Sequence, residues 1–159
     1  MTDSLKVERV PFDHPDAVAL RDAMVAEVTQ LYSTQRDAGT GGVPTAIDEP
    51  TVLVTLVAYD GDRPVAHAVL RRLGDEVEIK RMFVCPDARG KGAADALMRE
   101  LEAAARTSGA MRVILHTGDR QLAAIRTYER HGYTPIPVYE PYVGMSESLC
   151  FEKILPPAP

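Results

Sequence analysis

Residues 78–94 constrain the fold most, because they join a strand pattern to a helix pattern through a short turn with two glycines. Before the turn, Ile79, Phe83 and Val84 favour β-structure, and Cys85-Pro86 then ends the strand. After the turn, apolar residues recur at the spacing of one helical face: Leu97, Met98, Leu101, Ala104 and Ala105. The segment therefore predicts a strand–turn–helix unit.

The turn, Arg89 to Ala94, has the composition of an anion-binding site. Backbone N–H groups at a helix start and the helix dipole favour negative charge, and Arg89 and Lys91 add full positive charges. Gly90 and Gly92 let the backbone approach a ligand closely. The turn is not a Walker loop, which needs Gly-Lys-Ser/Thr, nor a dinucleotide fingerprint, which needs a third glycine. For this stretch alone, a solvated loop without a ligand is the alternative.

Composition narrows the class of protein. A chain of 159 residues, 45% hydrophobic and 26% charged, suits one domain over 1–159 with a substantial core and an irregular tail over 155–159. The net charge of −5 argues against a nucleic-acid partner, and no apolar run is long enough for a membrane span or a signal peptide. Cys85 and Cys150 lack disulfide or metal-ligand spacing, so we expect a reduced, cytoplasmic protein without a metal.

The remaining sequence alternates predicted strands and helices. A strand over 6–12 precedes a helix that starts near Pro15 and runs to about Tyr32. Residues 33–50 are rich in glycine and proline without an apolar period, which predicts a long loop. The later elements are strands over 52–59, 64–72 and to Val84, a helix from about Gly90 to Thr107, a strand over 111–116, a helix over 122–130, and strands over 133–138 and 149–154. This order predicts an α/β or α+β domain, a mixed sheet with helices on both faces.

Two segments together resemble the GNAT N-acetyltransferases. Arg89 to Ala94 resembles their Arg/Gln-x-x-Gly-x-Gly/Ala signature, and Val77 to Val84 resembles the strand before it. The later helix motif is matched by Gln121, Ala124, Tyr128, Glu129, Gly132 and Tyr133. The likeness covers about residues 50–155 and implies the GNAT acyl-CoA N-acyltransferase fold.

The resemblance implies acetyl-CoA as co-substrate. Its pyrophosphate would lie on the N–H groups of residues 89–94, and its pantetheine arm would pair with the backbone of Met82 and Val84 as an added strand does. The implied cofactor-binding residues are Met82, Phe83, Val84, Arg89, Gly90, Lys91, Gly92, Ala93, Ala94 and Gln121. An enzyme of this kind needs no metal.

The resemblance also implies catalytic roles. Tyr128 matches the family tyrosine that acts as a general acid toward the CoA sulfur, and a phenol with a pKa near ~10 keeps its proton at neutral pH. Glu78 matches the glutamate that serves as base in some histone acetyltransferases of the family. His116 and a water molecule are the other candidates for the base. The alternatives are a core tyrosine and a strand glutamate that faces solvent or pairs with Lys80 or Arg81.

The acceptor is expected to be an amine, with a small molecule favoured over a protein. The loop over 33–50 would lie beside its pocket, and acidic residues could favour a cationic acceptor: Asp48, Glu49, Glu140 and Glu147. Two other functions stay open: an acetyl-CoA-binding regulator without catalysis, and an acyltransferase that uses a longer acyl-CoA. Members of the family often dimerise, so a homodimer is also expected.

Overall fold

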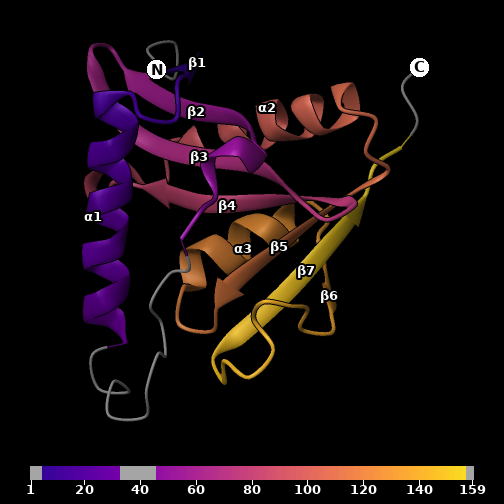
Figure 1. The fold of residues 1–159 in the computed structure, drawn as a ribbon. Coiled ribbons are helices and arrows are strands. Elements are labelled where there is room, and N and C mark those ends of the chain that lie inside the picture. The colour runs from indigo at the N-terminus through magenta and orange to yellow at the C-terminus, as the bar shows by residue number, and fades with distance from the viewer. Residues whose placement is uncertain (1–4, 33–45, 157–159) are drawn as a thin grey trace.

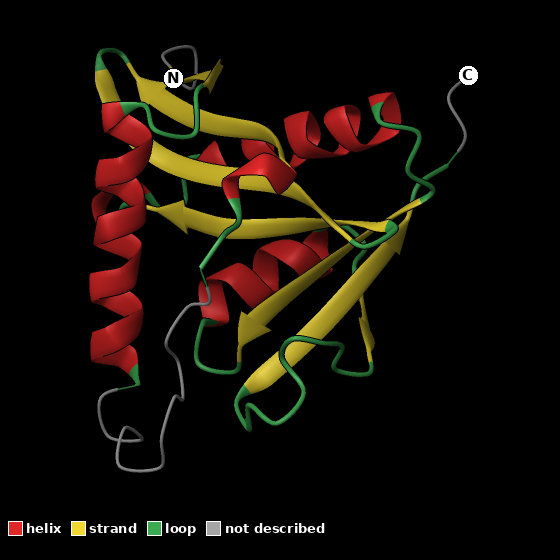
Figure 2. Cartoon of the chain, in the orientation of Figure 1, coloured by secondary structure: helices red, strands yellow, loops and turns green. Residues whose placement is uncertain are grey.

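The computed structural model of the chain describes residues 5–32 and 46–156. Its strands are β1 Leu5–Val10, β2 Val52–Asp60, β3 Arg63–Leu73, β4 Glu76–Val84, β5 Arg112–Gly118, β6 Thr134–Ile136 and β7 Ser148–Ile154. They form one sheet in the order β1-β2-β3-β4-β5-β7-β6 (Figures 1 and 2). Most of the predicted loop over 33–50 lies outside the described residues, since 33–45 are not among them, and so does the end of the predicted tail.

Helices cover both faces of the sheet, as predicted. Helix α1 (Pro15–Leu31) packs on one face, and α2 (Ala93–Thr107) and α3 (Leu122–Arg130) belong to the core on the other. Two short 3-10 helices, η2 (Glu49–Thr51) and η3 (Pro86–Ala88), precede β2 and α2. Helix α1 places Ala17, Leu20, Met24 and Val28 against the sheet, and these residues recur at the spacing of one helical face. Across 5–32 and 46–156, none of the helices has the length and apolarity of a membrane span.

Helix α2 starts three residues later than the predicted Gly90. Gly90 and Gly92 have φ of +80° and +93°, in the left-handed region that a right-handed helix excludes. Near Gly109 the helix ends as predicted: the Gly109 N–H donates to the Arg106 carbonyl, and the next N–H donates to the Ala105 carbonyl. The two glycines of the turn therefore set where the helix begins.

Strands β4 and β5 separate after a short parallel ladder. Their register consists of Val77 with Val113, Glu78 with Ile114, and Ile79 with Leu115. Beyond these pairs the two strands run apart toward their C-terminal ends (Figure 1). All other neighbouring strands are antiparallel. The only parallel pair in the described sheet is thus the place where it opens.

A β-bulge in β4 accompanies this separation. Opposite β3, one extra residue of β4 falls between the pair His67–Phe83 and the pair Val69–Lys80. Arg81, within that interval, has a φ of +57° although it is not a glycine. Bulges bend and twist the strand that carries them, so this one redirects β4 away from β5.

His67 of β3 holds the bulge from the α1 side. Its buried ring places Nδ1 2.9 Å from the Arg81 carbonyl oxygen and Nε2 3.0 Å from Arg21 Nη1. A guanidinium only donates, so Nε2 accepts and Nδ1–H donates to the carbonyl. Arg21 is itself fixed, because its guanidinium stacks 3.8 Å from the centre of the Phe12 ring. Burial is the main cause that lowers the pKa of His67 to about 4, so the ring is neutral at pH 7.

His67 should make the fold less stable in mild acid. Its pKa of about 4 in the folded protein lies below the usual 6.5, so the unfolded chain binds a proton that the folded chain excludes, and stability falls as pH drops from 6.5 toward 4. His67→Asn, which keeps an N–H donor but does not titrate, should remove roughly 2–3 kcal/mol of that fall, measured by urea unfolding at several pH values. An unchanged acid dependence in His67→Asn would contradict this assignment.

Candidate active site

A groove of about 770 Å³ lies between α1, the end of β4, the start of α2 and the start of α3. Of the ten residues predicted to bind the cofactor, all but Lys91 line it: Met82, Phe83, Val84, Arg89, Gly90, Gly92, Ala93, Ala94 and Gln121. The structure therefore brings the strand, the turn and two residues of the later motif, Gln121 and Ala124, to a single groove.

The N-terminus of α2 supplies the groove with hydrogen-bond donors and positive potential. The first N–H groups of a helix have no intrahelical partner, and the helix dipole places partial positive charge there. Arg120, Arg126 and Arg130 add cationic side chains along the α3 side of the groove. This arrangement suits a ligand with phosphate groups.

Arg89 lies at the groove edge in an ion pair with α1. Its Nη2 lies 2.8 and 2.9 Å from the two carboxylate oxygens of Glu27, and its Nε donates to the Val84 carbonyl at 3.0 Å. Both side chains of the pair are partly exposed, so the ion pair contributes little to stability. Arg89 is thus positioned by β4 and α1 together.

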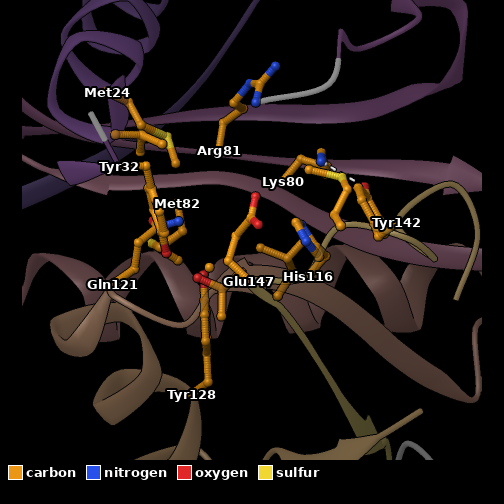
Figure 3. Close-up of a pocket in the computed structure, with 15 residues that line it drawn as sticks. Met24, Tyr32, Lys80, Arg81, Met82, His116, Gln121, Tyr128, Tyr142 and Glu147 are labelled. Atoms are coloured by element: carbon orange, nitrogen blue, oxygen red, sulfur yellow. Dashed lines mark hydrogen bonds between the residues drawn. The ribbon is translucent and has the colours of Figure 1, made fainter. Parts of the chain in front are cut away.

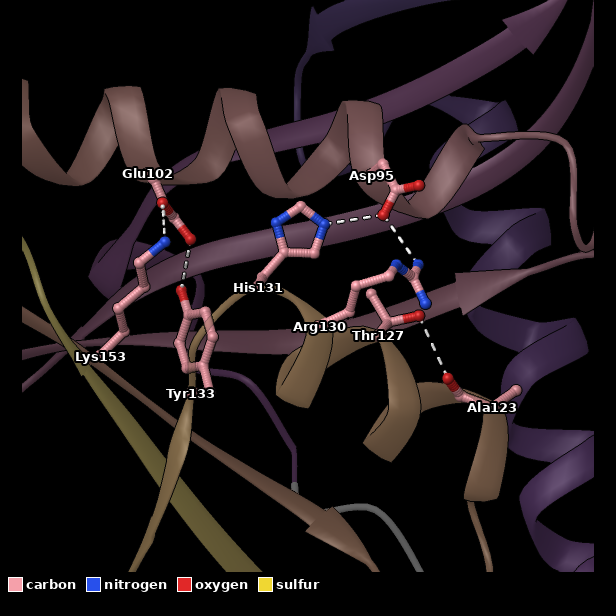
Figure 4. A network of polar contacts seen from close by, with 8 residues as sticks. All are labelled: Asp95, Glu102, Ala123, Thr127, Arg130, His131, Tyr133 and Lys153. Atoms are coloured by element: carbon pink, nitrogen blue, oxygen red, sulfur yellow. Dashed lines mark hydrogen bonds and ion pairs between the residues drawn. The ribbon is translucent and has the colours of Figure 1, made fainter.

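Two acidic residues of α2 hold the end of α3 in place (Figure 4). Asp95 accepts from Arg130 at 2.8 Å and from His131 at 2.7 Å, and Glu102 accepts from the Tyr133 hydroxyl at 3.1 Å. The hydrogen bonds from Arg130 and His131 are the main reason that the pKa of Asp95 is lowered. These contacts fix the wall of the groove that carries α3.

A smaller cavity of about 60 Å³ adjoins the groove where β4 leaves β5. The groove and the cavity share Met24, Val28, Met82 and Gln121. The titratable side chains of the cavity come from five parts of the chain (Figure 3): Tyr32, Lys80, Arg81, His116, Tyr128, Tyr142 and Glu147.

Tyr128 of α3 lines this cavity. Its ring packs against Tyr133 and Phe151, with centroids 6.1 and 6.4 Å away. Among residues 5–32 and 46–156, no side chain or backbone group hydrogen-bonds to its hydroxyl. Burial raises its pKa above the usual 10, so the hydroxyl holds its proton at neutral pH. The geometry offers a proton donor in the cavity that adjoins the groove.

Glu78 lies behind the cavity wall. It is fully buried, lines neither the cavity nor the groove, and accepts from Arg71 Nε at 2.8 Å. Its other oxygen accepts from the hydroxyls of Tyr139 at 2.7 Å and Tyr142 at 2.9 Å. A proton from the cavity would reach Glu78 through the Tyr142 hydroxyl. The solvent-facing alternative for Glu78 is wrong, because the side chain is buried. Its carboxylate forms an ion pair with Arg71 on the neighbouring strand β3, a partner that the sequence did not predict.

Tyr142 links Glu78 to the cavity and stacks on His116. The two rings are parallel, 3.8 Å apart, and the Tyr142 hydroxyl accepts from Lys80 Nζ at 2.7 Å. Burial is the largest cause that lowers the pKa of Lys80 to about 8 and that of His116 to about 3. At pH 7 Lys80 is therefore mainly charged and His116 is neutral, which makes His116 a weak proton acceptor.

Glu147 is the carboxylate of the cavity. It precedes β7, is 5% exposed, and lies between Tyr128 on one side and Tyr142 on the other in Figure 3. Its carbonyl accepts from the Asp119 N–H at 2.9 Å, which ties it to the end of β5. Of the four acids predicted near the acceptor, Glu147 is the one that lines the cavity within the described part of the chain.

Tyr32 closes the cavity beside Gly118. Its hydroxyl accepts from the Arg120 N–H at 2.8 Å and donates to Asp119 Oδ1 at 3.3 Å. A Cβ on Gly118 would lie 2.1 Å from this hydroxyl oxygen. Gly118 is therefore required by space, and the end of α1 reaches β5 because no side chain intervenes.

Sequence reasoning did not select Lys80, Tyr32 or Tyr142. Lys80 carried a local signal, since it is a lysine in the middle of a predicted core strand. Tyr142 carried none, because its partners Lys80 and Glu78 lie far from it in the sequence. Its place depends on the connection between β6 and β7.

Comparison with known proteins agrees with this architecture. Residues 21–133 match the sequence profile of the acetyltransferase (GNAT) family. A protein of Azospirillum brasilense named IAA acetyltransferase is 37% identical over 78 residues, which are 49% of this chain and 51% of that protein. The chain spans about half the length of the curated relatives it matches.

Solved structures match over nearly the whole chain. A Klebsiella pneumoniae protein proposed to be an acyl-CoA N-acyltransferase is 25% identical with a TM-score of 0.77, over 95% of this chain and 97% of that one. A GNAT family acetyltransferase of Elizabethkingia anophelis, solved with acetyl-CoA bound, is 13% identical with a TM-score of 0.67, over 96% of this chain and 99% of that one. The second likeness shows the fold alone.

Gly118→Ala should destabilise the protein through its clash with Tyr32. We expect a loss of roughly 1–3 kcal/mol, because the hydroxyl oxygen of Tyr32 occupies the space that the new methyl group needs. In a Tyr32→Phe background the same substitution should cost less, since the nearest atom is then absent. Urea unfolding of the four proteins gives the coupling free energy. An equal cost in both backgrounds would show that the clash is relieved elsewhere.

Proposed function

Because the chain belongs to the acetyltransferase (GNAT) family, we propose that it transfers an acetyl group from acetyl-CoA to a primary amine, which attacks the thioester directly. One observation carries the proposal: nine residues predicted to bind the cofactor line one groove, and this groove opens at Met82 and Gln121 into a cavity that contains Tyr128.

The groove would hold coenzyme A with its diphosphate at the start of α2. The N–H groups around Gly92 to Ala94 and the Arg89 side chain would face the phosphates. The pantetheine arm would follow β4, pairing with the backbone of Met82 and Val84 where β5 no longer runs alongside. The related fold solved with acetyl-CoA bound supports this choice of ligand.

The thioester carbonyl would then lie near the mouth of the cavity. The amine nitrogen forms a bond to the carbonyl carbon, the carbon–sulfur bond breaks, and the Tyr128 hydroxyl gives its proton to the departing thiolate. The raised pKa of Tyr128 keeps the phenol protonated at neutral pH, which a general acid requires. Burial of the departing thiolate beside it would raise the pKa of the thiol as well, which favours its protonation. The tyrosine regains its proton from solvent or from the acceptor.

The acceptor ammonium must lose a proton before attack. Glu78 is the base predicted from the sequence, and we keep it as a proposal in which the Tyr142 hydroxyl passes its proton to Glu78 and takes one from the cavity. The low pKa of His116, about 3, argues against His116 as the base. Water in the cavity is the third route.

Neither alternative function gains support from the site. A regulator that only binds acetyl-CoA needs the groove, but it has no use for a buried tyrosine hydroxyl at the mouth of a polar cavity. A longer acyl group would need more volume than the cavity of about 60 Å³ beside the groove provides. The cytoplasmic location and the homodimer stay predictions from the sequence.

Arg89→Glu should weaken binding of coenzyme A. The substitution removes a cation from the groove edge and adds an anion beside Glu27, so we expect a Kd about 10- to 100-fold higher by calorimetry at low salt. Arg72→Glu is the matched control, because it makes the same charge change on an exposed residue of β3 that pairs with Val77, at the other end of β4 from the groove. Equal affinities for Arg89→Glu and Arg72→Glu would count against a diphosphate at this turn.

Tyr128→Phe should lower turnover far more than it lowers affinity for acetyl-CoA. Loss of a general acid costs about 10²- to 10⁴-fold in rate, while the groove itself keeps its shape. Thiol release from acetyl-CoA with a panel of amines measures the rate, and calorimetry measures the binding. Tyr133→Phe serves as control, since the neighbouring ring loses a hydroxyl that bonds Glu102 outside the cavity. Parallel losses of rate and affinity in Tyr128→Phe would assign its hydroxyl to packing.

A further inference from the structure

We propose that the acceptor is a small amine that also carries a carboxylate, such as an α-amino acid, because the cavity presents opposite charges at its two ends. This inference rests on the acetyl transfer proposed above and names the class of its second substrate. It is argued from the positions of Glu147 and Lys80 relative to the groove.

The end of the cavity next to the groove is acidic. Gln121 and Met82 line both spaces, and Tyr32 and Glu147 lie beside them. Two contacts place Glu147 there: its carbonyl bonds the N–H of Asp119, and the side chain of Asp119 bonds the Tyr32 hydroxyl. The negative charge of Glu147 is also one of the smaller causes, after burial, of the raised pKa of Tyr32. An acceptor ammonium next to Glu147 would lie on the thioester side.

The far end of the cavity is basic. Lys80, only 6% exposed, bonds the Tyr142 hydroxyl at 2.7 Å, and its Nζ lies 4.7 Å from the centre of the Tyr142 ring. The stacked pair of Tyr142 and His116 forms the wall there, and the charge of Lys80 acts on His116. Figure 3 shows Lys80 and Tyr142 on the side of Glu147 opposite to Tyr32 and Gln121. A carboxylate that extends from the amine away from the thioester would meet this ammonium.

The size of the cavity sets the scale of the acceptor. A water molecule needs about 10–15 Å³ of such space, so about 60 Å³ holds roughly five non-hydrogen atoms. A glycine- or alanine-sized molecule has this size. A long polyamine or a protein side chain with its flanking backbone would have to enter from the groove side, where the coenzyme lies.

Burial makes both contacts selective. Charge-assisted hydrogen bonds are short and strong, and they gain strength in a site shielded from water. An amine without a carboxylate would bring its apolar carbon atoms against Lys80 and lose that contact. The arrangement also makes Glu147, ahead of Glu78, the first carboxylate that the acceptor ammonium meets.

The test compares matched acceptors on the wild-type protein. Glycine and L-alanine are each paired with their amide and with the amine that lacks the carboxylate, and thiol release from acetyl-CoA gives kcat/KM. The amino acids should exceed both partners by about 10- to 100-fold, the value of one charged hydrogen bond. Equal or faster reaction of the carboxylate-free partners would overturn the proposal while leaving acetyl transfer intact.

Two variants assign the ends of the cavity. Lys80→Met should bring the ratio between amino acid and amide to within about twofold, whereas Lys6→Met, on the exposed face of β1, should leave it unchanged. Glu147→Gln should lower kcat/KM for both members of every pair. A ratio that survives Lys80→Met in a folded protein would overturn the role of Lys80. Calorimetry with acetyl-CoA is run on each protein. If the wild-type protein neither bound acetyl-CoA nor released thiol with any acceptor, the proposed function itself would be rejected.

Discussion

The separation of β4 from β5 is the constraint on which the rest of the site depends. Parallel pairing stops at Ile79 and Leu115. The later residues of β4 then line the cavity and the groove instead of pairing with β5. The bulge at Arg81 turns the strand, and His67 secures the bulge with a hydrogen bond to its carbonyl. The groove, the cavity and Lys80 all take their positions from this one irregularity. A regular sheet at this point would have no room for either space.

Buried charge shapes the cavity as much as backbone does. Arg71, Lys80 and Glu78 lie on neighbouring strands, and the hydroxyl of Tyr142 contacts all three. Such groups are costly to bury singly, so their mutual hydrogen bonds are what makes the arrangement tolerable in a core. The same network holds the ring of Tyr142 against His116 and so determines the far wall of the cavity. Lys80 therefore belongs to the network that stabilises this part of the core, and it is also the residue that we propose to bind the acceptor carboxylate.

The sequence predicted the elements well, because their signals are local. The helix over 122–130 and the strands over 111–116, 133–138 and 149–154 follow from local sequence patterns, and the structure confirms a helix or strand at each place. The groove proposed for the coenzyme followed from a motif whose glycines and helix start are contiguous. The cavity proposed for the acceptor did not, since Tyr32, Lys80, Tyr142 and Glu147 meet only through tertiary packing. The position of Glu78 behind Tyr142 could not be predicted either. Strand alternation indicates which face of the sheet a side chain is on, but not how far it lies from a pocket.

The contact between Arg89 and Glu27 has a consequence for ligand entry. A phosphate that approaches the turn finds the guanidinium already neutralised by a carboxylate from α1. Binding at the proposed site would therefore exchange one anion for another, and the carboxylate that would be released belongs to the same helix that supplies Met24 and Val28 to the cavity. Arrival of the first substrate would loosen the attachment of α1 at the edge of the compartment for the second. A compulsory order of addition, with the nucleotide first, is the kinetic pattern that such a shared helix favours.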